Sequence, residues 1–123
     1  MISTAAKPPK PLRLNQRAQL VSAASFARWH EIASVTPGLT ALDRAILDML
    51  AEHYRRLQVQ GSAGSVTIEK MAAHIGSEPM SIRSSIKHLI ELCLLGVQPG
   101  GGQRPHEYLP ALPAAADDAA PPF

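Results

Sequence analysis

Residues 75–86 read IGSEPMSIRSSI, and this stretch indicates where one helix ends and the next begins. Gly76 permits a left-handed backbone and ends the helical pattern that precedes it. Pro79 is favoured at the first position of a helix, so a new helix is expected to begin there. Ile82 and Ile86 then recur at helical spacing and predict a buried face. The stretch therefore predicts two helices joined by a short turn.

Two helical patterns precede this turn. In the first, Thr40 is a good N-cap and Asp43 stands three residues later, where a carboxylate meets free backbone amides. Arg55 and Arg56 are predicted in its last turn, where cations suit the helix dipole. Before the second helix, residues 65–67 can form a short strand and a cap together. The apolar stripe of the first helix is formed by Leu42, Ile46, Met49, Leu50 and Tyr54 or His53, and that of the second by Ile68, Met71, Ala72 and Ile75.

Beyond the turn, the sequence predicts a helix over residues 79–92 and then a hairpin. Residues 94–97 can leave the helix as a first strand, and residues 106–109 return as a second strand. Pro99 and the three glycines that follow it form the turn between them.

Upstream of all these elements, residues 15–35 have a helical pattern that Asn15 or Ser22 can cap. A Thr-Pro-Gly sequence ends this extra N-terminal helix. Phe26 and Trp29 lie three residues apart in it. We expect both to be buried, either against the domain or in the interface of a homodimer.

Composition predicts one domain with disordered termini, because 123 residues is the size of a single domain. Residues 1–14 contain the proline-rich KPPKP and read as a disordered basic arm, whereas residues 111–123 read as a disordered tail of Ala, Pro and Asp. Between them, the N-terminal helix and turn occupy residues 15–38 and the main domain occupies residues 39–110.

The net charge of +2 conceals a gradient along the chain. Residues 1–30 contain basic residues and no acid, whereas acids and bases balance between residues 39 and 110. This asymmetry indicates an arm that contacts a polyanion, although a solvated arm would have the same composition. The basic residues of the first thirty are Lys7, Lys10, Arg13, Arg17 and Arg28.

Several kinds of site have no support in the sequence. Cys93 is the only cysteine, which excludes an internal disulfide and a cysteine-based metal site. The five histidines lie on different predicted elements without metal-binding spacing, and the glycines after Pro99 lack the lysine of a phosphate-binding loop. No base, nucleophile and oxyanion donor stand together. We therefore expect no enzyme, no metal and no cofactor.

The sequence also predicts a cytoplasmic protein. No apolar run approaches the ~18 residues of a membrane helix. The N-terminus lacks the apolar region of a secretory signal, and its prolines argue against the amphipathic helix of a mitochondrial transit peptide.

The segment LTALDRAILDMLAEHY, residues 39–54, and the segment 66–110 together resemble the winged helix-turn-helix domain of phage and plasmid replication initiators. MarR-type and GntR-type regulators share its outline. Gly76 stands where this family has its turn glycine. The resemblance implies a mainly α fold with a small β-hairpin, in which residues 79–92 enter the major groove of DNA. Residues 97–109 would be the wing, which grips the adjacent backbone.

Helical geometry predicts which side chains of this helix would face DNA, since ~100° per residue with Ile82 inward leaves one face outward. Serine hydroxyls suit phosphates or base edges, arginine can pair with guanine, and Met80 can touch a thymine methyl group. The basic arm and the wing would add contacts to phosphates. The predicted DNA-binding residues are Lys7, Lys10, Arg13, Arg17, Met80, Ser81, Arg83, Ser84, Lys87, Gln103 and Arg104.

The chain departs from the family pattern at three places. Glu78 stands where a capping Ser or Thr is common, unless Ser77 takes that role, and the first turn reads Pro79-Met80-Ser81 where Arg, Gln or Thr is usual. Cys93 stands where many members have glycine. Because the domain is electrically balanced, we expect the arm to supply affinity and the short helix to supply specificity. The expected function is double-stranded DNA binding by a small prokaryotic transcriptional regulator or replication-associated protein. The alternatives are a protein–protein adaptor that does not bind DNA and an RNA-binding role.

Overall fold

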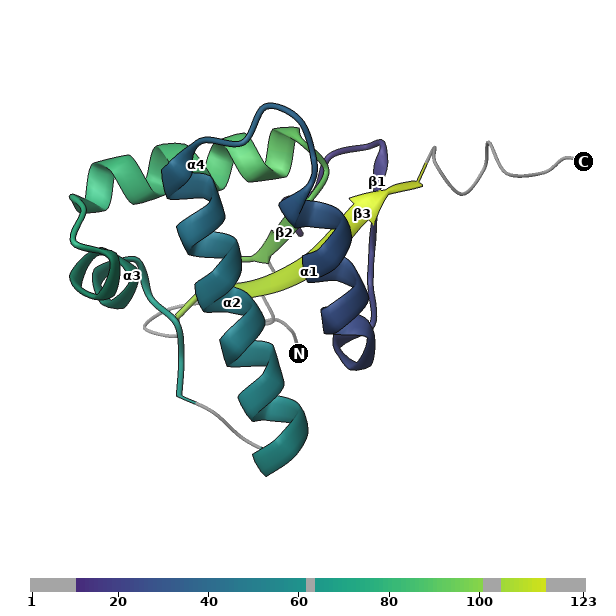
Figure 1. The fold of residues 1–123 in the computed structure, drawn as a ribbon, viewed down its shortest axis with the longest axis horizontal. Coiled ribbons are helices and arrows are strands. Elements are labelled where there is room, and N and C mark those ends of the chain that lie inside the picture. Colours follow the sequence, from purple (N-terminus) through teal and green to yellow (C-terminus); the bar gives the residue numbers. More distant parts are fainter. Residues whose placement is uncertain (1–10, 62–63, 101–104, 115–123) are drawn as a thin grey trace, which may run out of the picture.

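The computed structural model describes residues 11–61, 64–100 and 105–114, and in these ranges the chain is mainly helical with a small antiparallel sheet. Figure 1 shows α1 and α2 side by side in front of the sheet, with α4 crossing near the start of α2. The coarse fold prediction is therefore confirmed. In chain order the elements are β1 (Ala18–Leu20), a 3-10 turn (Ala23–Ser25), α1 (Phe26–Ser34), α2 (Ala41–Gln60), α3 (Ile68–Ile75), α4 (Pro79–Glu91), β2 (Leu95–Gln98) and β3 (Glu107–Pro113).

The long helix α2 begins as the sequence predicts. Thr40 Oγ1 accepts a hydrogen bond from the Asp43 backbone N–H at 3.0 Å, and the Asp43 carboxylate accepts one from the Thr40 N–H at 2.9 Å. This capping box satisfies backbone amides that a helix start leaves free. The helix ends at Gly61, whose φ of 78° is left-handed. Arg55 and Arg56 therefore precede the last turn, and their predicted place at the helix end is wrong because no helix-breaking residue stands before Gly61.

The next two helices and the turn between them also follow the prediction. Thr67 Oγ1 accepts from the Lys70 N–H at 3.1 Å and caps α3. Gly76 has a φ of 83° and ends that helix, and Pro79 is the first residue of α4. The short strand expected at residues 65–67 is absent from the described structure, because Thr67 is engaged as a cap and the segment joins no sheet.

The sheet has the strand order β1-β3-β2, and both neighbours of β3 run antiparallel to it. The predicted hairpin is present, since Leu95 pairs with Pro110 and the register continues along β2 and β3. β3 extends to Pro113, so the disordered tail expected from residue 111 onward does not begin there. The reason is that β1 pairs with residues 111–113 and gives this end of β3 its own partner.

The N-terminal segment differs most from the prediction. Residues 18–20 form β1 instead of a helix, and the α-helix begins only at Phe26. Asn15 Oδ1 accepts from the Arg17 N–H at 2.8 Å, a local bond that turns the chain instead of capping a helix. Ser22 accepts a backbone hydrogen bond only in the short 3-10 turn before α1.

The end of the predicted disordered arm is attached to the sheet. The Arg13 N–H donates to the Val97 carbonyl at 2.8 Å, and the Val97 N–H donates to the Arg13 carbonyl at 2.9 Å. Gly96 leaves room for this segment, because a Cβ there would lie 3.1 Å from Leu20 Cδ2 and 3.2 Å from Leu14 Cδ1. The expected disorder therefore does not extend to the last residues of the arm.

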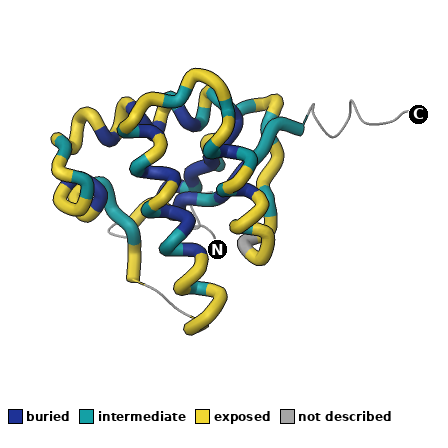
Figure 2. Tube along the Cα trace, in the orientation of Figure 1, coloured by how far each residue is buried: buried dark blue, intermediate teal, exposed yellow. Residues whose placement is uncertain are grey.

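Trp29 lies in the core, with none of its surface exposed. Its Nε1–H donates to the Leu94 carbonyl at 2.8 Å, and its ring packs against that of Tyr54 in a T-shaped arrangement at a centroid distance of 5.4 Å. The Tyr54 hydroxyl in turn donates to the Tyr108 carbonyl at 2.8 Å, which ties α2 to β3. Figure 2 shows the buried segments gathered where the helices face the sheet. Of the two expected places for Trp29, burial against the domain is therefore correct. No surface of the indole is left for the predicted homodimer contact. Phe26 is half-buried.

Cys93 follows α4 with a φ of 67°, and no other non-glycine residue among those described has a positive φ. An L side chain rarely adopts this conformation, whereas glycine adopts it readily. The left-handed backbone is the physical reason why glycine would suit this position.

Candidate nucleic-acid interface

Helix α4 presents the exposed face that helical geometry predicts. Ile82, Ile86 and Leu89 are buried against the core. Met80 is 74% exposed, and Glu78 begins the helix without a side-chain cap, so the amides of the first turn stay open to an acceptor. The predicted contact residues on this helix are all exposed, namely Met80, Ser81, Arg83, Ser84 and Lys87.

An open groove of about 710 Å³ lies beside this face, between α4, the start of α3 and the β2–β3 hairpin. We call it the α4–hairpin groove. Its apolar lining includes Ile68, Ile86, Ile90, Val97 and Tyr108. Its charged lining consists of Arg13, Glu69, Arg83, Lys87 and Glu91.

The cations of this groove are available to a ligand. Arg13, Arg83 and Lys87 form no ion pair with any described residue. Burial and the charge of Glu69 raise the pKa of Tyr108, although Arg83 and Arg13 oppose that rise. The phenol is therefore protonated at neutral pH and offers a hydrogen-bond donor among these charges.

The structure brings some of the predicted site residues together and separates others. The bridge to Val97 places Arg13 at the groove, beside Arg83 and Lys87 of α4. Arg17 is exposed at the opposite end of β3, where its carbonyl accepts from the Ala114 N–H at 2.7 Å. Arg17 does not line the groove, although its place four residues after Arg13 keeps the two Cα atoms within ~14 Å of each other. The remaining predicted contacts, Lys7, Lys10, Gln103 and Arg104, lie outside the described residues.

Sequence reasoning missed a polar network between α2 and α4. Asp43 is 1% exposed, and its carboxylate accepts from the Ser85 hydroxyl, from the Thr40 N–H and from His88 Nδ1 at 2.6 Å. Burial raises the pKa of Asp43, but the hydrogen bonds from Ser85, Thr40 and His88 outweigh it and leave the pKa below its ordinary value. Ser85 and His88 lie three residues apart on one face of α4, a signal that becomes informative only once α2 is known to pack there.

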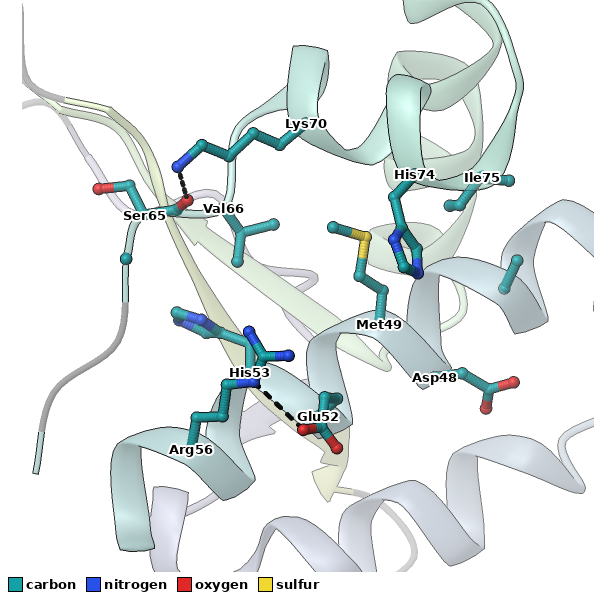
Figure 3. Close-up of a pocket in the computed structure, with 12 residues that line it drawn as sticks. Asp48, Met49, Glu52, His53, Arg56, Ser65, Val66, Lys70, His74 and Ile75 are labelled. Atoms are coloured by element: carbon teal, nitrogen blue, oxygen red, sulfur yellow. Dashed lines mark hydrogen bonds and ion pairs between the residues drawn. The ribbon is translucent and has the colours of Figure 1, made fainter. Parts of the chain in front are cut away.

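A second cleft, of about 580 Å³, lies between α2 and α3, and its charges are already engaged (Figure 3). Arg56 Nε lies 3.2 Å from a Glu52 carboxylate oxygen, and Lys70 Nζ donates to the Ser65 carbonyl at 2.9 Å. Burial and the charge of Arg56 lower the pKa of His53 in this cleft, against the opposing charge of Glu107. The α2–α3 cleft is therefore less suited to a polyanion than the α4–hairpin groove.

Comparisons with known proteins find no matching family, no similar curated protein and no similar solved structure. Among the helices in the described ranges, none has both the length and the apolar character that crossing a membrane requires. The described residues also contain no group of three His, Cys, Asp or Glu side chains that could hold a metal ion.

Proposed function

We propose that the chain is a winged helix-turn-helix protein that binds double-stranded DNA through α4 and the α4–hairpin groove. In this arrangement α4 enters the major groove and the β2–β3 hairpin lies against the adjacent sugar-phosphate backbone. The protein acts as a small cytoplasmic transcriptional regulator or as a replication-associated protein.

One observation carries this proposal. Arg13, Arg83 and Lys87 come from two segments far apart in the sequence, yet they line one groove beside the exposed face of α4. Glu69 and Glu91 line it too, so the cations exceed the acids by one. A domain that is neutral as a whole therefore has a local positive excess where a phosphate backbone would lie.

The arrangement also supports phosphate contacts and base contacts by different residues of the interface. Phosphate contacts fix the orientation of a protein on DNA, whereas contacts with base edges read the sequence. Arg13 and Lys87 suit phosphates, and Lys7 and Lys10 precede Arg13 in the chain and can extend that row. Met80, Ser81 and Ser84 are short or apolar side chains at the start of α4, where recognition helices contact base edges.

The test is binding of a fluorescent duplex of randomised sequence by the full chain, measured by anisotropy at low salt. The double variant Arg83→Ala/Lys87→Ala should weaken binding. The matched control is Arg56→Ala/Lys70→Ala, which removes the same charge from the α2–α3 cleft and should bind like the wild type. Equal losses in the two double variants would mean that net charge alone governs the binding.

The second candidate function is a protein–protein adaptor. The 74% exposure of Met80 and the apolar residues of the α4–hairpin groove favour it, because such surfaces also suit a partner peptide. The same experiment separates the two functions. A wild-type chain that binds no duplex at low salt would favour the adaptor.

A further inference from the structure

The flank of α4 that faces away from the α4–hairpin groove has a different chemistry. A hollow of about 640 Å³ lies there, between the start of α2 and the first turns of α4. Its polar lining includes Glu78, Ser81, Ser84 and His88, with Asp43 at its base and no lysine or arginine. The two flanks of the same helix are therefore cationic on one side and rich in hydrogen-bond acceptors on the other.

His88 is held in one orientation on this flank. Its Nδ1 lies 2.6 Å from Asp43 Oδ2, and Asp43 is itself fixed by the Ser85 hydroxyl and the Thr40 N–H. Because the Asp43 carboxylate accepts these bonds, Nδ1 must carry a hydrogen and donate it. The side chain of His88 is 37% exposed, and Nε2 forms no hydrogen bond with a described residue. The buried carboxylate thus sets the tautomer and leaves Nε2 free to meet a ligand.

We propose that His88 is a specificity-determining residue that reads a base edge in the major groove through Nε2, with Asp43 as its positioning residue. This inference rests on the proposed DNA-binding function. In the neutral imidazole Nε2 is an acceptor, which matches the exocyclic amino group of cytosine or adenine. In the imidazolium Nε2–H is a donor, which matches the O6 and N7 acceptors of guanine.

The charges around His88 favour a base over a phosphate. Asp43 of α2 and Glu78 at the start of α4 both face this hollow, and neither is offset there by lysine or arginine. A phosphate would be repelled by both carboxylates, whereas an amino group is attracted, and a glutamate can itself accept from the cytosine N4 amino group. The cationic flank can then hold the backbone while the acceptor flank faces the bases.

The experiment selects bound sequences from a randomised duplex pool at about pH 8 and at about pH 5.5, which bracket the range in which histidines commonly titrate. The wild type should change its preference at one position, from cytosine or adenine at the higher pH to guanine at the lower pH. The expected change is roughly 2- to 10-fold, the value of one hydrogen bond. His88→Gln should abolish the change, because an amide does not titrate. The matched control is His74→Gln, an exposed histidine of the α2–α3 cleft that should leave the change intact.

The outcomes separate this inference from the proposed function. A preference that changes equally in His88→Gln, or a wild type with no change, overturns the role of His88 and leaves DNA binding standing. A uniform loss of affinity across all sequences in His88→Gln shows that the Asp43–His88 pair only ties α4 to α2, and it also overturns the inference. If wild type binds no duplex at either pH, both proposals fall. Should His88→Gln unfold, the ¹⁵N chemical shift of His88 Nε2 in the wild-type chain tests the role of His88 instead. Contact with a base must change this shift when duplex is added, and an unchanged shift overturns the inference.

Discussion

Replacing Gly96 by valine should loosen the N-terminal segment from the sheet and leave the helices in place. A Cβ at this position would lie 3.1 Å from Leu20 Cδ2, 3.2 Å from Leu14 Cδ1 and 3.5 Å from the Arg13 carbonyl oxygen. The leucine atoms are the ends of flexible side chains and can yield to a single methyl group. Gly96→Ala should therefore change the free energy of unfolding by less than ~1 kcal/mol. The two further methyl groups of valine overpack the contact, which typically costs ~1–3 kcal/mol.

Two measurements check this prediction. Urea denaturation gives the stability of both variants. Hydrogen exchange reports on the Val97 amide, which donates to the Arg13 carbonyl at 2.9 Å. In the valine variant this amide should exchange much faster, while amides in the middle of α2, such as that of Leu50, keep their protection. Displacing Arg13 should also make the slope of log K for DNA binding against log salt less steep by ~0.9, which is the contribution of one phosphate contact. Unchanged protection of Val97 in a valine variant as stable as the alanine variant would refute the reasoning.

Three further predictions concern the core, the polar network and the arm. Ile86→Ala should lower the free energy of unfolding by ~2–5 kcal/mol, because Ile86 is buried and its loss leaves a cavity; an unchanged melting temperature would show that it does not pack in the core. Because hydrogen bonds hold the pKa of Asp43 below its ordinary value, its ionised carboxylate stabilises the fold above ~pH 4, and this contribution is lost as the pH falls through the lowered pKa. Asp43→Asn should therefore flatten the acid-side decline in urea denaturation below ~pH 4, and an identical decline in both proteins would contradict that role. Deleting residues 1–10 removes Lys7 and Lys10 but keeps Arg13 on the sheet, so it should reduce the salt dependence of duplex binding by ~1.8 without changing stability; an unaltered salt dependence would show that the arm does not contact phosphates.

The starts of α2, α3 and α4 and the end of α3 could be predicted because the signals that set them are local. Thr40 with Asp43 and Thr67 with Lys70 are caps within a few residues of each other, and Gly76 acts on its own backbone. Such features depend on neighbours in the sequence and need no knowledge of the tertiary fold.

The N-terminal strand could not be predicted in the same way. β1 consists of Ala18, Gln19 and Leu20, none of which is a strong signal for a strand. It forms because residues 111–113, more than ninety positions away, offer an open edge of β3. Pairing at such a separation is decided by tertiary packing and not by local propensity.

The residues of the candidate site also fall into those that local sequence signals predict and those that depend on distant contacts. The exposed face of α4 follows from helical spacing, so Arg83, Ser84 and Lys87 could be assigned to it from the sequence. The place of Arg13 in the groove depends on its bridge to Val97, and the orientation of His88 depends on Asp43 of another helix. These are contacts between distant segments, which the sequence pattern does not reveal.

The salt dependence of duplex binding tests the central claim most directly, because each phosphate contact contributes ~0.9 to the slope of log K against log salt. Arg13, Arg83 and Lys87 together should give the wild type a slope of about −2.7, made steeper by any contacts of the arm. Arg83→Ala/Lys87→Ala should make the slope less steep by ~1.8, and Arg56→Ala/Lys70→Ala should leave it unchanged. A wild-type slope near zero, or a slope that the Arg83→Ala/Lys87→Ala variant does not alter, would contradict DNA binding through the α4–hairpin groove.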